Sequence, residues 1–228
     1  MSEIKMKQPV QTDLRPCIRI KDPISALTHF IGFIAAIHSL PLLLTKAAVR
    51  SDDISTMIGL SIYGLSLIVL YGASSAHHSF ILPERGTRAL KKIDHICIFY
   101  LIAGTYTPLC LNLMKDVQGK RLLIAIWIAA AVGTLIKFFF VYCPKYVSSI
   151  LYIAMGWFAL FRITTLYHLL GKGGFLWLLA GGVFYTIGGI LYALRFRLSE
   201  KWGEHEIFHI LVLLGSLCHY ILIFLYAI

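Results

Sequence analysis

The feature that most constrains this chain is a series of apolar stretches, each long enough to cross a lipid bilayer. A transmembrane helix needs about 20 mainly apolar residues, and seven such stretches occur, at about residues 23–45, 54–80, 93–113, 122–141, 148–170, 175–194 and 205–228. Only 14% of the residues are charged, whereas a soluble domain carries about 25%. The sequence therefore predicts an all-α membrane protein, a seven-transmembrane helix bundle, and excludes a water-soluble fold.

The connections between these stretches are short, which leaves no room for a soluble domain. Residues 1–22 are polar and lack the central apolar run of a cleavable signal peptide. We therefore predict a cytoplasmic polar tail at 1–22 and one membrane domain at 23–228. Small residues repeat at an interval of seven in the sixth stretch, a pattern typical of close helix packing, at Gly181, Gly182, Gly188 and Gly189.

The basic residues predict the orientation of the bundle. Thirteen lysines and arginines fall on the side of the N-terminal tail, and six fall in the connections on the other side. Because cytoplasmic loops carry the excess of basic residues, the N-terminus is expected inside and the C-terminus outside. The formal net charge of +10 favours anionic headgroups at the cytoplasmic face as partners. No contiguous basic stripe is present, so nucleic acid is not an expected partner.

Two basic residues and the cysteines fall outside this pattern. Lys137 lies near a predicted helix end and is expected to snorkel, whereas Arg162 lies deeper and could face a polar cavity. The cysteines are odd in number and form no CxxC pair, so we expect small apolar fillers and not a disulfide framework or a thiolate metal site. They are Cys17, Cys97, Cys110, Cys143 and Cys218.

Several polar side chains share one depth near the inner face of the predicted bundle. Such groups are costly in a membrane and usually functional. His205 and His209 differ by about 40° in direction and about 6 Å in height on a helix, so both can bind one cation. A third imidazole would complete the three-ligand arrangement of a catalytic zinc site. His78 is favoured over His77 because it shares a helix face with the preceding Ser74, and the third predicted helix begins at this depth with Asp94.

Plainer explanations exist for each residue. A single histidine at a membrane interface is more often an anchor or a hydrogen-bonding group, and Asp94 could cap its helix. His219 lies about 21 Å beyond His205, too far for the same site, while His29 could line a cavity. The pattern around Glu206 also matches the HExxH motif of zinc proteases. Only nineteen residues follow His209, and none is acidic, which weakens the protease alternative.

The motifs, taken in order, resemble those of the bacterial hemolysin III proteins, which belong with the progestin and adiponectin receptor family. The resemblance covers nearly the whole chain from Asp22 onward, and its segments are SSAHHSF at 74–80, Asp94-His95, LIAGTYTP at 101–108, Met155-Gly156-Trp157 and HEIFH at 205–209. It implies a seven-helix bundle in the bacterial inner membrane. It also implies a zinc ion held near the cytoplasmic face by His78, His205 and His209, with Ser74 and Asp94 beside it.

A mechanism follows from this implied site. Zinc bound by three neutral imidazoles lowers the pKa of bound water to about 7. Asp94 would orient this water and shuttle its proton, and Ser74 would hydrogen-bond either the water or the developing oxyanion. We expect a ceramidase-like zinc-dependent hydrolase of an amphipathic lipid amide or ester, involved in membrane homeostasis. The alternatives are a receptor or sensor with structural zinc, a cytolytic pore as the family name suggests, and an HExxH protease. No ring of pore-lining polar residues is evident, and the oligomeric state is not predicted.

Overall fold

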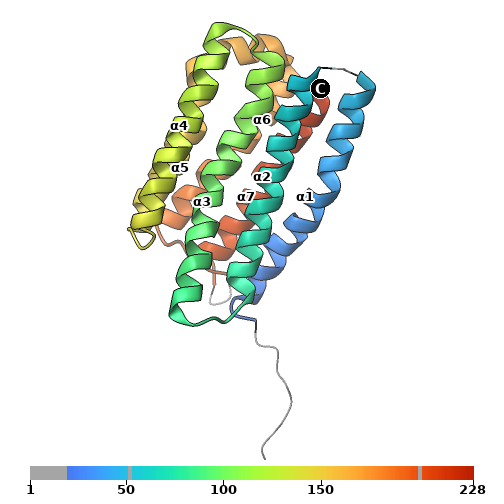
Figure 1. Ribbon diagram of the computed structural model, residues 1–228. Coiled ribbons are helices and arrows are strands. Elements are labelled where there is room, and N and C mark those ends of the chain that lie inside the picture. The colour runs from blue at the N-terminus through green and yellow to red at the C-terminus, as the bar shows by residue number, and fades with distance from the viewer. Residues whose placement is uncertain (1–19, 51–52, 200–201) are drawn as a thin grey trace, which may run out of the picture.

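The computed structural model describes residues 20–50, 53–199 and 202–228, and these residues form helices and no strands. The long helices run side by side as a bundle (Figure 1). A short π-helical turn, η1 (Leu109–Leu113), extends α3, and a 3₁₀ turn, η2 (Trp157–Arg162), separates α5 from α6. The helices are α1 (Pro23–Arg50), α2 (Ile54–Ser79), α3 (Glu84–Pro108), α4 (Val117–Phe139), α5 (Lys145–Gly156), α6 (Ile163–Ala193) and α7 (Glu204–Tyr226). The all-α prediction is confirmed.

Local sequence signals set where several helices begin. Asp53 caps α2 by accepting a hydrogen bond from the Ser55 amide at 3.0 Å. Asp116 caps α4 in the same way, through the Gly119 amide at 2.6 Å. These carboxylates satisfy amides that have no partner within the helix. Pro83 precedes α3, a position that suits proline because it has no amide hydrogen to satisfy.

Among the described residues, six helical segments are long and apolar enough to cross a membrane, where the sequence predicts seven. The difference lies in one segment of 49 residues, Lys145–Ala193, which at 1.5 Å per residue would exceed twice the roughly 30 Å hydrocarbon core. This segment merges the predicted stretches 148–170 and 175–194. The count of seven crossings and the sides of the termini stay predictions.

The 49-residue segment reverses direction at Gly171, whose φ of 61° and ψ of −178° are not helical. The indole nitrogen of Trp157 donates a hydrogen bond to Thr186 Oγ1 at 2.9 Å. Farther from the reversal, a Cβ at Gly189 would lie 3.0 Å from the Ile153 side chain. Residues at matching distances before and after Gly171 are thus in contact, so the segment is a hairpin of two antiparallel parts.

The core ties the first two helices to the last two. A Cβ added to Gly32 on α1 would lie 2.7 Å from Leu213 on α7 and 2.8 Å from Tyr71 on α2. The Tyr71 hydroxyl donates a hydrogen bond to Ser216 Oγ at 2.6 Å. The hydroxyl of Tyr185 on α6 is hydrogen-bonded to the same Ser216 Oγ at 2.7 Å. This packing gathers the starts of α1, α3 and α7 and the end of α2 at one end of the bundle (Figure 1).

Candidate metal centre

Three histidines from two helices converge at this end of the bundle. Ligand nitrogens of His78, His205 and His209 all lie within 4.8 Å of one another. The Nε2 atoms of His78 and His205 are 2.9 Å apart. His209 is 1% exposed, and its ring centroid lies 4.5 Å from that of His205. Three imidazole nitrogens in a buried cluster fit a divalent cation that prefers nitrogen ligands, zinc above all.

The structure separates His78 from its neighbour His77. His77 belongs to a second possible ligand group, with His78 and Asp94, and not to the group that contains His205 and His209. Both rings are buried, but their centroids are 4.8 Å apart and their planes differ by 65°. Adjacent residues on a helix point about 100° apart, so only one of them can face α7. That residue is His78, as the sequence predicts.

An aspartate outside the helices orients His78. Asp22, just before α1, accepts a hydrogen bond from His78 Nδ1 at 2.9 Å. Partial burial alone would raise the pKa of Asp22, but the hydrogen bond and charge of His78, with the charge of Lys21, leave it below its ordinary value. Because Nδ1 is engaged with an ionised carboxylate, the lone pair of His78 Nε2 is free for a metal ion. This role is not among the sequence predictions, and its available signal is an acidic residue at the start of the first span.

Asp94 and Ser74 lie beside the histidines. Asp94 is 6% exposed, and its Oδ2 is 3.9 Å from His78 Nε2. Ser74 is 1% exposed, lies one helical turn before His78, and its hydroxyl interacts with the buried Asp94 carboxylate. Both residues line the cavity, where their polar atoms can contact a ligand or water beside the histidines.

Glu206, the acid of the HExxH pattern, has a structural role. One carboxylate oxygen accepts a hydrogen bond from the Gly203 amide at 3.0 Å, which caps α7. The other accepts from the Ser25 hydroxyl on α1 at 3.4 Å. Both oxygens are thus engaged in holding the start of α7. Helix capping thus gives the acid of this motif a structural role.

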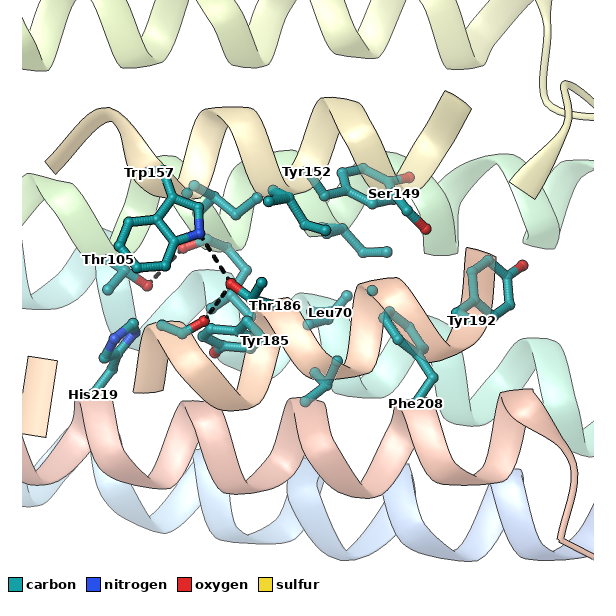
Figure 2. Close-up of a pocket in the computed structure, with 18 of the residues that line it drawn as sticks. Leu70, Thr105, Ser149, Tyr152, Trp157, Tyr185, Thr186, Tyr192, Phe208 and His219 are labelled. Carbon is teal, nitrogen blue, oxygen red and sulfur yellow. Dashed lines mark hydrogen bonds between the residues drawn. The ribbon is translucent and has the colours of Figure 1, made fainter. Parts of the chain in front are cut away.

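A cavity of about 140 Å³ extends from the histidine cluster into the bundle. Ser74, Asp94 and His205 line it at one end. Figure 2 shows Ser149, Tyr152, Tyr192 and Phe208 along its length, with Trp157, Thr105 and His219 farther from the cluster. His219 is fourteen residues beyond His205 on α7, which corresponds to about 21 Å. Most of the lining is apolar or aromatic, so the cavity suits an apolar group.

The other residues singled out in the sequence have different positions. His29 lines the cavity, and its ring stacks on that of His209 with 3.6 Å between centroids. Arg162 is not among the cavity-lining residues and instead pairs with Asp116 at 2.5 Å, at the opposite end of the bundle. Lys137 does not snorkel as expected, because its side chain is fully buried.

Comparisons with known proteins find relatives over nearly the whole chain. A family model described as Haemolysin-III related matches residues 18–220. The protein named Hemolysin-3 from Bacillus cereus is 36% identical over 210 residues, which cover 91% of this chain and 93% of that protein. A Hemolysin-3 homolog from Bacillus subtilis (strain 168) is 34% identical over 210 residues, 92% of this chain and 96% of its own length. The human Monocyte to macrophage differentiation factor is 27% identical over 181 residues, 77% of this chain and 73% of its own.

Proposed function

Since the chain belongs to the haemolysin III-related family of membrane proteins, we propose that it is a zinc-dependent hydrolase of an amphipathic lipid amide or ester. The observation that carries this proposal is the convergence of His78, His205 and His209 at one end of an apolar cavity. The residues that could hold a metal ion therefore lie beside an apolar space inside the bundle. A soluble substrate would not need a lining of this kind.

The three histidines would hold the metal ion, and the rest of the site would support them. Zinc bound there supplies a Lewis acid that makes water reactive near neutral pH. Asp22 fixes the tautomer of His78 by accepting its Nδ1 hydrogen, so that Nε2 faces His205. A carboxylate behind a ligand histidine also makes that histidine a stronger ligand.

Asp94 and Ser74 would handle the proton and the developing charge. The Asp94 carboxylate, buried in the same chamber, would accept a proton from the attacking water and pass it to the leaving amine or alcohol. The Ser74 hydroxyl, which lies beside Asp94 in the cavity lining, would donate a hydrogen bond to the oxygen of the scissile carbonyl. The acyl chain would lie along the cavity toward His219.

The proposed topology places this site at the cytoplasmic face of a bacterial inner membrane. The hairpin at Gly171 supports seven crossings, because each of its two antiparallel parts, before and after this residue, would cross once. An odd number of crossings puts the termini on opposite sides, and the distribution of basic residues favours the N-terminus inside. Anionic headgroups would then surround the end of the bundle that carries the histidines.

The decisive experiment measures bound zinc and released fatty acid on the protein in reconstituted bilayers. We expect about one zinc per chain, lost for the most part in His78→Ala, His205→Ala and His209→Ala and kept in His219→Ala. Asp94→Asn preserves shape but removes the proton acceptor. It should keep zinc, with affinity weakened at most about 10 to 100-fold, while hydrolysis of ceramides, phospholipids or acyl amides falls about 10² to 10⁴-fold.

The alternatives predict different outcomes of the same experiment. A receptor with structural zinc would bind the metal and release no fatty acid from any lipid offered. A cytolytic protein, as the printed name of the Bacillus relatives suggests, would leak dye from vesicles without dependence on zinc. An HExxH protease would lose activity in Glu206→Gln and keep it in Asp94→Asn. Any of these results would refute the hydrolase.

A further inference from the structure

A buried lysine at the same end of the bundle has no carboxylate partner. Lys137, near the end of α4, is 0% exposed. Its ammonium contacts the Ser148 hydroxyl and the Cys143 sulfur, the latter at 3.2 Å. No Asp or Glu in the described ranges forms an ion pair with it. A buried cation without an anion is strongly disfavoured. We therefore ask which neighbour of Lys137 can carry a negative charge.

Cys143 is the neighbour that can carry a negative charge. It lies in the turn after α4, directly before Pro144, and α5 begins at the next residue. The positive end of a helix and a nearby ammonium both stabilise a thiolate. Burial by itself would raise the pKa of this thiol, but hydrogen bonds with Ser148 and Lys137 leave it below its ordinary value.

The other charged groups around this turn do not oppose a thiolate. Lys91 on α3 lies within electrostatic range of Lys137 and Lys145. The carboxylate of Glu204 is paired with Lys145 at 2.6 Å. The hydroxyls that interact with the sulfur, those of Tyr152 and Tyr192, are neutral near neutral pH. The local field is therefore cationic.

Cys143 also differs from the other described cysteines in its access to small molecules. It is partly exposed, whereas the remaining three are buried within helices and make no hydrogen bond in the described ranges; they are Cys97, Cys110 and Cys218. A thiol with both access and a cationic neighbour meets the two conditions for reactivity. The expectation of a small apolar filler is wrong for this residue.

We propose that Cys143 is a modification site, a reactive thiolate paired with Lys137 that forms mixed disulfides with small-molecule disulfides. The Cys143 sulfur attacks one sulfur of the small disulfide, a new S–S bond forms, the old S–S bond breaks, and the other half leaves as a thiolate. The exchange needs no further oxidant. The adduct removes the anion beside Lys137 and lies next to Ser148, whose neighbour Ser149 lines the cavity.

The test is a pH titration of thiol reactivity on the full chain in bilayers. Cys17, which lies outside the described residues, is replaced by serine to simplify the readout. Iodoacetamide labelling, located by peptide mass spectrometry, should reach Cys143 first, with a midpoint below the ordinary value of about 8.5. Oxidised glutathione should add one glutathionyl group at the same residue. Lys137→Met should raise the midpoint and slow labelling at pH 7 by about tenfold.

Lys92→Met is the matched control. It removes a cation at the same end of the bundle, which lies 4.6 Å from the Phe138 ring and makes no hydrogen bond with Cys143, so labelling should not change. If Lys137→Met fails to fold, Ser148→Ala should give a smaller upward shift of the midpoint. A wild-type midpoint at or above about 8.5, or labelling no faster than that of Cys97, would overturn the proposal without any variant.

Discussion

Asp22 shows how much a single residue outside the helices can contribute to a site within them. Its carboxylate contacts His78 across 56 positions of sequence. Asp22→Asn keeps the size and an accepting oxygen but removes the charge that strengthens the histidine as a ligand. We expect zinc affinity to fall about 10 to 100-fold, measured by competition with a chelator of known affinity.

The control for Asp22 is Asp53→Asn, a change of the same kind at the cap of α2, at the opposite end of the bundle. It should leave zinc affinity unchanged. Equal affinities in wild type and Asp22→Asn would show that the contact with His78 does not orient a metal ligand.

At the scale of elements, Asp116 joins the start of α4 to the turn before α6. The hydrogen bond from the Gly119 amide is the main cause of the pKa of Asp116 lying below its ordinary value, and the pair with Arg162 adds to it. A lowered pKa in the folded state means that the carboxylate stabilises the fold above its unfolded pKa. This stabilisation is lost as pH falls through the folded value.

We therefore expect Asp116→Ala to lower the melting temperature at pH 7. Asp116→Asn should lower it less, because asparagine still caps a helix but cannot pair ionically with Arg162. Both differences from wild type should shrink as the pH falls below about 4. Thermal unfolding of the detergent-solubilised protein at pH 7 and pH 3 measures this. A difference that persists unchanged in acid would contradict the assigned role of the charge.

The glycines of α6 provide a matched pair within one element. A Cβ at Gly181 would lie 2.3 Å from the His219 ring on α7, whereas a Cβ at Gly182 would meet nothing within 4 Å. Gly181→Ala should therefore destabilise the contact of α6 with α7. Gly182→Ala should be neutral or stabilising by up to about 1 kcal/mol, because alanine favours helix more than glycine does.

The measurement is the melting temperature of each alanine variant in the same detergent, which should be lower for Gly181→Ala than for Gly182→Ala. Close packing at Gly181 would be disproved if both variants behaved alike. Gly188, seven residues on, also faces α7, through Leu211, whereas Gly189 faces α5. The interval of seven in the sequence thus serves two different interfaces.

For the whole molecule, the prediction concerns topology. Reporter tags at the N-terminus and in the connection 81–92 should be cytoplasmic, and a tag at the C-terminus should be external, because thirteen basic residues oppose six. Protease protection in spheroplasts distinguishes the two sides. Termini on the same side would leave the hairpin at Gly171 without two full crossings and would favour six spans.

The sequence by itself determined the features that depend on short-range periodicity. Apolar length predicts helices that cross a membrane, and a spacing of four places His205 and His209 on one helix face. The same rule, applied to Ser74, favours His78 over His77. These inferences need only the geometry of a single helix, and His78, His205 and His209 do lie close together in the structure.

Only the tertiary structure decided the features that depend on contacts between distant segments. Helical periodicity cannot show that Asp22 meets His78, that Glu206 touches Ser25, or that Lys137 is buried against Cys143. These partners come from different elements or from turns, where no regular period applies. Their arrangement follows from how the helices pack, because burial makes polar groups find partners wherever the fold brings them.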